Sequence, residues 1–229
     1  MTEDEWLACI DPPKMLEFLR GKAGARKLRL FACACCRRLQ LSEDSPAMHI
    51  VEAAERHADG LAGRKELQLM SSKLGARGGY SSAWALNNAL HSVLHVQAQE
   101  AAQGASAFCG DYAYFRLIER VAGTSPGDQQ KTVNAKRDEQ EKQTILLRDI
   151  VGNPFWLPAV SPAWRTWSNG TVEKLAQCIY DERTFNRLPL LADALEDAGC
   201  ADAEILGHLR SPKPHVRGCW PLDLLIGSS

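Results

Sequence analysis

The sequence lacks an excess of charge of either sign. Across 229 residues, 27 Lys and Arg side chains face 28 Asp and Glu side chains, so the formal net charge is −1. Non-specific binding to nucleic acid depends on a positive field, which this composition does not supply. The overall charge therefore does not favour nucleic acid as a partner.

Long hydrophobic runs are also missing. The longest apolar stretches, 30–36 and 220–227, are far shorter than the roughly 20 residues that a helix needs to span a bilayer. Residues 1–13 are acidic and carry neither the basic segment nor the apolar run of a signal peptide. These absences favour a cytoplasmic protein without a membrane partner.

The signatures of common enzyme classes are absent too. The chain contains no GxSxG, HRD, DFG, HExxH or Rossmann fingerprint. The glycine-rich stretch 75–82 (GARGGYSS) lacks the GxxxxGK[ST] order of residues of a phosphate-binding P-loop, and no predicted strand precedes it. We expect a loop that leads into a helix cap at Ser81 or Ser82. We therefore lean towards a protein that is not an enzyme and needs no cofactor.

What the sequence does contain is helical periodicity, whereas no alternating run of β-branched residues predicts a strand. Helix starts are marked by the capping box Thr2–Glu5 and by the cap-plus-proline pairs at 11–12 and 45–46. Further helices are predicted at about 26–40, 64–75, 82–104, 111–122, 188–198 and 203–210. The expected fold is all-α, a multi-helix globular protein with short helices.

Changes in composition suggest how the chain is divided. Residues 124–143 are almost entirely polar, which predicts a solvated helix or linker between an N-terminal helical region at 1–123 and a C-terminal one at 144–229. The two regions could also pack as one domain. An irregular loop rich in Trp and Pro follows residue 152, and we expect Trp156, Trp164 and Trp167 to pack onto the C-terminal helices. An apolar tail after residue 211 is expected to dock on the same core.

Both ends of the chain resemble a known set of sequences. The opening MTEDEWLACIDPPKMLEFLRGKAGARKLRLFACACCRR and the ending from LLRDIVGNPFWLPAVSPAWRTW to HVRGCWPLDLLIG are similar to a large paralogous family of uncharacterised proteins, best known from planctomycete bacteria. The similarity covers roughly the first 65 and the last 85 residues. Relatives often carry a second cysteine after the histidine that aligns with His208, where this chain has Leu209. The resemblance implies no activity.

Eight cysteines with irregular spacing indicate reduced thiols in this context and no disulfide framework. Three of them fall in FACACCRR, residues 31–38. On a helix, Cys35 lies on the core face and Cys36 beside it, while Cys33 points towards Arg26 and Arg37, so the three thiols cannot converge on one ion. We interpret them as packing residues.

The strongest metal-ligand candidates lie near the C-terminus. Cys200, His208, His215 and Cys219 supply two thiols and two imidazoles within twenty residues, the ligand types of a tetrahedral zinc site. The set has no CxxC knuckle, and helix packing also explains Cys200 beside Gly199. Zinc is therefore an alternative and not our first interpretation. His91 and His95, one turn apart, are interpreted as partly buried or surface histidines.

A possible functional surface combines charged and aromatic residues: Asp181, Glu182, Arg183, His215, Arg217 and Trp220. Structural ion pairs are the simpler interpretation of these charges. Our leading hypothesis is a protein–protein interaction or regulatory module with an unidentified protein partner. The alternatives are a zinc-binding protein or enzyme that uses the C-terminal Cys/His set, and nucleic-acid binding through the basic cysteine helix, whose cations are Arg26, Lys27, Arg29, Arg37 and Arg38.

Overall fold

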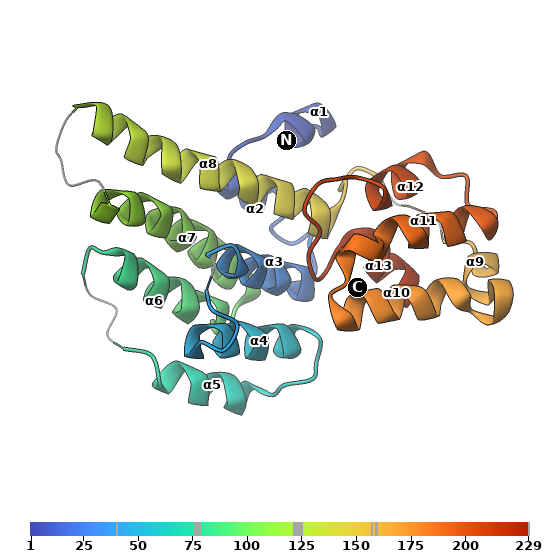
Figure 1. Ribbon diagram of the computed structural model, residues 1–229, viewed down its shortest axis with the longest axis horizontal. Coiled ribbons are helices and arrows are strands. Elements are labelled where there is room, and N and C mark those ends of the chain that lie inside the picture. Colours follow the sequence, from blue (N-terminus) through green and yellow to red (C-terminus); the bar gives the residue numbers. More distant parts are fainter. Residues whose placement is uncertain (40, 76–78, 121–125, 157, 159, 229) are drawn as a thin grey trace. The chain divides into compact units, whose positions relative to one another are not determined.

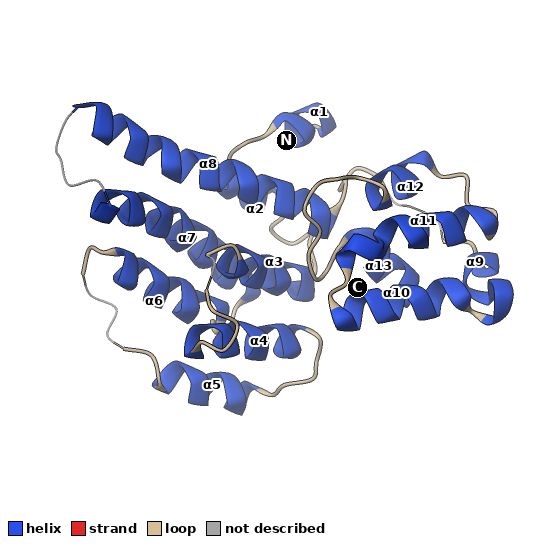
Figure 2. Ribbon diagram, in the orientation of Figure 1, coloured by secondary structure: helices blue, strands red, loops and turns tan. Residues whose placement is uncertain are grey.

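The protein is all-α, as the sequence predicts. A computed structural model describes residues 1–39, 41–75, 79–120, 126–156, 158 and 160–228. Within these ranges the regular structure consists of thirteen α-helices and two 3-10 helices, without a strand (Figures 1 and 2). The chain forms two compact units, Met1–Leu147 and Arg148–Ser229.

The first unit is built from seven helices and most of an eighth. They are α1 (Glu3–Ala8), α2 (Pro12–Phe18), α3 (Ala25–Arg37), α4 (Pro46–Ala58), α5 (Arg64–Ser72), α6 (Ser82–Val93), α7 (Ala98–Arg120) and α8 (Pro126–Val151), of which the last turn belongs to the second unit. The predicted caps are confirmed: Thr2 and Glu5 form a capping box, and the side chains of Asp11 and Ser45 accept from backbone N–H groups of α2 and α4.

Helix α3 lies inside the first unit and packs against α4, α6 and α7. Cys33, Cys35 and Cys36 are all buried, which agrees with their interpretation as packing residues, and Cys33 is buried although it lies off the core face that periodicity indicates. The physical reason is that neighbouring helices cover α3 on several sides, whereas periodicity alone indicates one core face. All eight cysteines of the chain are free thiols.

The boundary between α6 and α7 differs from the predicted one. The sequence suggests helices at 82–104 and 111–122, but α6 ends at Val93 and α7 runs without a break from Ala98 to Arg120. The guanidinium of Arg29 donates to the carbonyls of His95 and Val96, which satisfies backbone acceptors just after α6. Asp111 does not cap a helix, because its carboxylate pairs with Lys136 at 2.6 Å.

The described part of the polar segment 124–143 is helical and lies in α8; positions 124–125 lie outside the described residues, as do 76–78 of the glycine-rich stretch. Several of its polar side chains are buried with partners. Gln143 is fully buried and accepts from the Ser106 hydroxyl at 2.6 Å, and Glu139 accepts two hydrogen bonds from Arg38. The division between the units falls later in the same helix, after Leu147.

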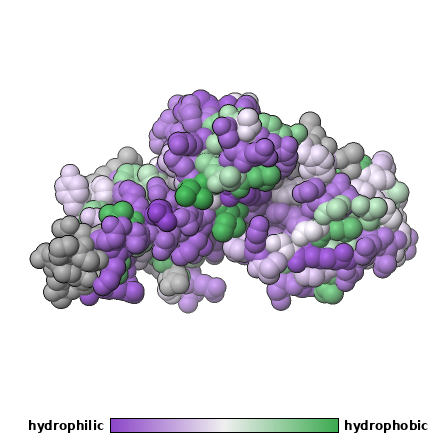
Figure 3. All heavy atoms as spheres, turned by 90° about the horizontal axis from the view of Figure 1, so that it is seen from above, coloured by the Kyte–Doolittle hydropathy of each residue, from purple (hydrophilic) through white to green (hydrophobic). Residues whose placement is uncertain are grey.

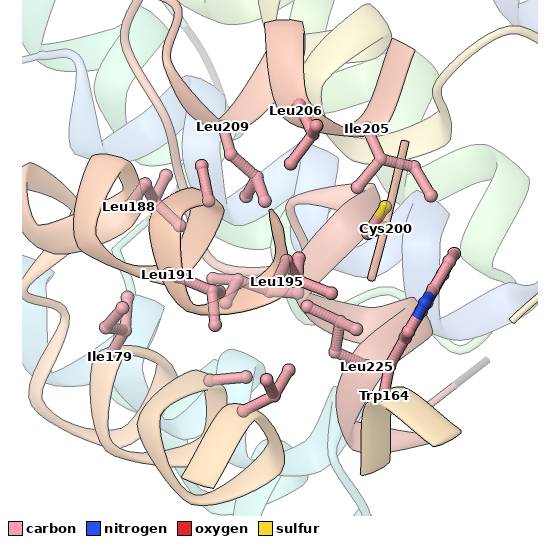
Figure 4. Packing of buried hydrophobic residues seen from close by; sticks show 14 of the residues in the cluster. Trp164, Ile179, Leu188, Leu191, Leu195, Cys200, Ile205, Leu206, Leu209 and Leu225 are labelled. Atoms are coloured by element: carbon pink, nitrogen blue, oxygen red, sulfur yellow. The ribbon is translucent and has the colours of Figure 1, made fainter. Parts of the chain in front are cut away.

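The second unit contains the end of α8 and five further α-helices with two 3-10 turns. They are α9 (Pro162–Thr166), η1 (Trp167–Asn169), α10 (Thr171–Glu182), η2 (Phe185–Arg187), α11 (Leu188–Asp197), α12 (Ala203–Leu209) and α13 (Trp220–Ile226). Their apolar faces form one core (Figure 4). Trp164 belongs to it and Trp156 and Trp167 pack against it, which confirms the expected docking of the Trp-rich loop. The tail docks as helix α13.

No helix among the described residues is both long enough and apolar enough to cross a bilayer. On the face drawn in Figure 3, hydrophilic residues predominate and the hydrophobic ones form separate patches.

Candidate metal centre

Four potential metal ligands meet in the second unit. The donor atoms of Asp149, His208, His215 and Cys219 lie within 4.8 Å of one another. Three of the four predicted residues are therefore brought together. Cys200 is not among them, because it is buried in the apolar core of the unit, 2% exposed. A carboxylate that the sequence interpretation missed takes the fourth position.

The four ligands come from three parts of the chain. Asp149 lies in the last turn of α8 and His208 in the last turn of α12. His215 precedes a tight turn in which the Cys219 N–H donates to the Val216 carbonyl at 3.0 Å, and Gly218 adopts φ +91° there. Such a turn requires a residue that tolerates positive φ. The sequence HVRGC therefore places Cys219 back beside His215.

Asp149 is the centre of a buried hydrogen-bond network. Its Oδ1 accepts from His215 Nδ1 at 2.6 Å and from His208 Nε2 at 2.9 Å, and its Oδ2 accepts from the backbone N–H of Val216 at 2.9 Å. Cys219 Sγ lies 3.4 Å from His208 Nε2 and 3.7 Å from His215 Nδ1. The Asp149 residue is 3% exposed and Cys219 is fully buried, whereas His208 and His215 are partly exposed, so solvent reaches the network only from the side of the histidines.

The protons of this network can be placed from its partners. The Ser211 carbonyl can only accept, so His215 Nε2 carries a proton and donates to it at 3.2 Å. Burial alone would lower the pKa of His215, but the Asp149 carboxylate outweighs burial and raises it. Burial would likewise raise the pKa of Asp149, yet hydrogen bonds from His208 and His215 hold it below the ordinary value. Without a metal, the pair is a carboxylate facing the His215 imidazolium, whose two N–H groups donate to Asp149 and to the Ser211 carbonyl.

Trp220 fixes the orientation of His208. Its indole N–H donates to His208 Nδ1 at 3.0 Å, so the proton of a neutral His208 ring sits on Nε2, facing Asp149. A cation bound at Nε2 would displace that proton to Nδ1 and break the indole hydrogen bond. Trp220 is itself held by an edge contact with Trp156, with ring centroids 5.6 Å apart.

The arrangement suits metal coordination better than nucleophilic catalysis. In a Cys–His–Asp relay the thiol and the carboxylate approach opposite nitrogens of one ring. Here Asp149 and Cys219 approach the same nitrogen of each histidine, so the four ligand atoms gather in one place and the relay geometry is absent. Bond lengths of about 2.0–2.3 Å to tetrahedral zinc separate neighbouring ligand atoms by roughly 3.3–3.7 Å. Both sulfur–nitrogen distances fit this range, and the carboxylate would move outward by about half an ångström.

One sequence signal could have identified Asp149. It lies within a run whose neighbours Leu146, Leu147 and Ile150 are all buried. A carboxylate at such a position costs free energy unless a partner compensates it. A carboxylate inside an apolar helical run, as Asp149 in LLRDIVG, therefore indicates a buried partner or ligand.

The remaining residues of the predicted functional surface lie in other surroundings. Asp181 and Glu182 are exposed at the end of α10, where Asp181 accepts from Gln177 and Glu182 pairs with Arg187. Arg183 ends α10 with φ +54°. The Arg217 guanidinium lies 4.6 Å from the ring centroid of Tyr180. Only His215 and Trp220 of this set belong to the metal-ligand cluster and its immediate support.

Three of the four arginines of the basic cysteine helix pair with carboxylates of the same unit. Arg26 pairs with Asp59 at 2.8 Å, Arg37 with Glu55 at 2.7 Å and Arg38 with Glu139 at 2.9 Å. These ion pairs neutralise charges that a phosphate backbone would otherwise contact, so they give little support to nucleic-acid binding through this helix.

Comparison with models of protein families, with curated proteins and with solved structures finds no match for this chain. The similarity of its two ends to the planctomycete family stays a prediction.

Proposed function

We propose that the chain is a non-catalytic helical binding protein whose second unit is stabilised by one bound zinc ion. The observation that carries this proposal is the convergence of an oxygen, two nitrogens and a sulfur, from three separate parts of the chain, within 4.8 Å. Structural zinc sites are closed, whereas catalytic ones keep an accessible position. The burial of Asp149 and Cys219 favours the structural role.

The test compares two cysteines of the same unit. Protein purified without chelator is expected to contain about one zinc per chain. Cys219→Ala should lower that content to near zero, and Cys200→Ala, also buried but outside the cluster, should leave it unchanged. A folded wild-type protein that contains no metal and takes up none on titration with Zn²⁺ would overturn the proposal.

The indole of Trp220 supplies an independent readout. Zinc at His208 Nε2 should shift one of the six indole N–H signals in an NMR spectrum, and Trp220→Phe should remove that signal. A spectrum that stays unchanged on addition of Zn²⁺ would indicate that the buried network exists without a cation.

A protein partner is the second candidate function, within a cytoplasmic interaction or regulatory role. It is supported by Leu7 and Ile10, which are 55% and 54% exposed beside the end of α1. Two such side chains three positions apart offer more apolar surface than a single one such as Val133, and a larger apolar surface favours contact with another protein. The double change Leu7→Glu and Ile10→Glu should abolish co-purification of a specific partner, whereas Val133→Glu, 56% exposed on α8, should not.

A further inference from the structure

A second feature of the molecule, independent of the cysteine–histidine cluster, is a cavity in the first unit. It has a volume of about 240 Å³ and lies among α3, the end of α4, α5 and the end of α6. At about 30 Å³ for each water, it has room for roughly eight waters. Its described lining includes Arg29, Arg64, His57, His91 and His95 and contains no carboxylate.

The two arginines of this cavity differ from most other arginines of the unit. Arg26, Arg37, Arg38 and Arg56 each pair with a carboxylate. Within the described part of the chain, neither of the two cavity arginines has such a pair.

The charge of Arg29 is compensated only by neutral groups, because its guanidinium donates to the carbonyls of His95 and Val96. Burial is the main reason that the pKa of Arg29 is lowered, and the nearby charge of Arg64 adds to the effect. Two like charges that share a cavity without a counter-charge create a local positive potential.

The three histidines add hydrogen-bonding capacity. His57 Nδ1 donates to the Ala62 carbonyl at 2.8 Å, which leaves its Nε2 for another partner. His95 Nδ1 accepts from the Gln97 N–H at 3.2 Å, so the neutral ring carries its proton on Nε2. Within the part of the chain that the structure describes, three or more metal-type ligands come together only at the Asp149 cluster. The cavity histidines therefore form no comparable metal site.

We propose that this cavity binds a phosphate group, either as the free anion or as the phosphate monoester of a small molecule. Guanidinium groups match the geometry and charge of phosphate oxygens, and imidazoles and the neutral donors Gln68 and Ser71 complete a lining that favours a tetrahedral dianion. The volume exceeds what a single ion requires and leaves space for a short organic substituent.

The test uses charge-neutralising variants of two adjacent residues. Arg64 lines the cavity, whereas Lys65, also exposed in the first turn of α5, does not. A cation at a helix N-terminus opposes the helix dipole, so Arg64→Gln should leave the fold intact. Isothermal titration of the full chain with inorganic phosphate and with glycerol 3-phosphate should give saturable binding that Arg64→Gln weakens roughly tenfold and Lys65→Gln changes less than about twofold.

The two ligands distinguish the sources of the phosphate group. Tighter binding of glycerol 3-phosphate indicates a monoester ligand, and equal or weaker binding indicates the free anion. NMR signals of the His57 and His95 rings should shift with either ligand, whereas succinate should leave them in place. Absence of saturable binding, equal effects of the two variants, or an equal response to succinate would overturn the proposal.

Discussion

At the scale of single residues, Gly152 connects the end of α8 to the metal-ligand cluster. It has φ +76°, and a Cβ at this position would lie 3.0 Å from Cγ of Trp220. Trp220 in turn donates to His208. The glycine therefore meets two demands: it turns the chain after Asp149, and it leaves space for the indole that orients a ligand.

Gly152→Ala is expected to lower the free energy of unfolding by roughly 2–4 kcal/mol, because backbone strain and a collision with Trp220 add together. Gly199→Ala is a matched control, since Gly199 has φ +86° but nothing within 4 Å of its Cβ position. It should cost only the strain, about 1 kcal/mol. Urea unfolding measures both values, and equal losses would show that the indole adjusts freely.

Individual residues also show what could be predicted of the site. The sequence was sufficient to predict His208, His215 and Cys219 as ligands, because their residue types and short separation indicate a ligand set. Cys200 shares those properties but faces the apolar core, and Asp149 reaches the cluster from 59 residues before His208. Local spacing carries no information about such a distant contact, so the carboxylate could not be assigned from the pattern of cysteines and histidines.

At the scale of helices, local sequence signals predicted where helices start better than they predicted how the helices pack. The caps at Thr2, Asp11 and Ser45 are confirmed because each depends on side-chain and backbone groups a few residues apart. The predicted boundary between α6 and α7 was wrong because the carbonyls that follow α6 accept from Arg29, which is more than sixty residues away in the chain. The all-round burial of α3 likewise depends on neighbours that periodicity does not reveal.

The packing of α3 on α4 depends on a nearly buried ion pair. Glu55 is 2% exposed and accepts two hydrogen bonds from Arg37, at 2.7 and 2.8 Å. Arg37→Met should lower the free energy of unfolding by roughly 3 kcal/mol, because it removes two hydrogen bonds and the neighbouring positive charge from the buried Glu55 carboxylate. Arg20→Met, which breaks the exposed pair with Glu17, should change it little. Chemical denaturation of both variants tests this difference.

The start of α6 is tied to α7 by a carboxylate that responds to pH. Glu119 accepts from the Ser82 hydroxyl at 2.6 Å and from the Ser82 N–H at 2.8 Å, and these bonds lower its pKa below the ordinary 4.5. A carboxyl group whose pKa is lower in the folded state stabilises the fold at pH above its pKa in the unfolded chain. This stabilisation is lost as the pH falls through the pKa of the folded state. The stability lost in Ser82→Ala should therefore be constant above about pH 5.5 and shrink at lower pH.

Ser72→Ala provides the comparison for that measurement. The Ser72 hydroxyl donates to the Leu69 carbonyl, which does not titrate, so its loss should cost the same at every pH. A pH-independent difference for Ser82→Ala as well would contradict the role of Glu119.

At the scale of the whole molecule, each compact unit has its own stabilising groups. The candidate metal ligands all lie in Arg148–Ser229, whereas the buried Arg37–Glu55 pair lies in Met1–Leu147. If the cluster holds zinc as proposed, its removal with a chelator should therefore accelerate hydrogen exchange of buried amides in the second unit and leave the core of α3, α4 and α7 protected. Mass spectrometry of peptic fragments measures this, and equal acceleration in both units would contradict the division.

The long separations within the metal-ligand cluster have a kinetic consequence. The hydrogen bonds of Asp149 join residues 59 to 67 positions apart, while α11 packs against its chain neighbours α10 and α12. Local contacts close shorter loops and are expected to form earlier in folding. Interactions that are absent from the transition state change the unfolding rate and hardly change the folding rate. A cation at this cluster would accordingly extend the lifetime of the folded second unit without speeding its formation.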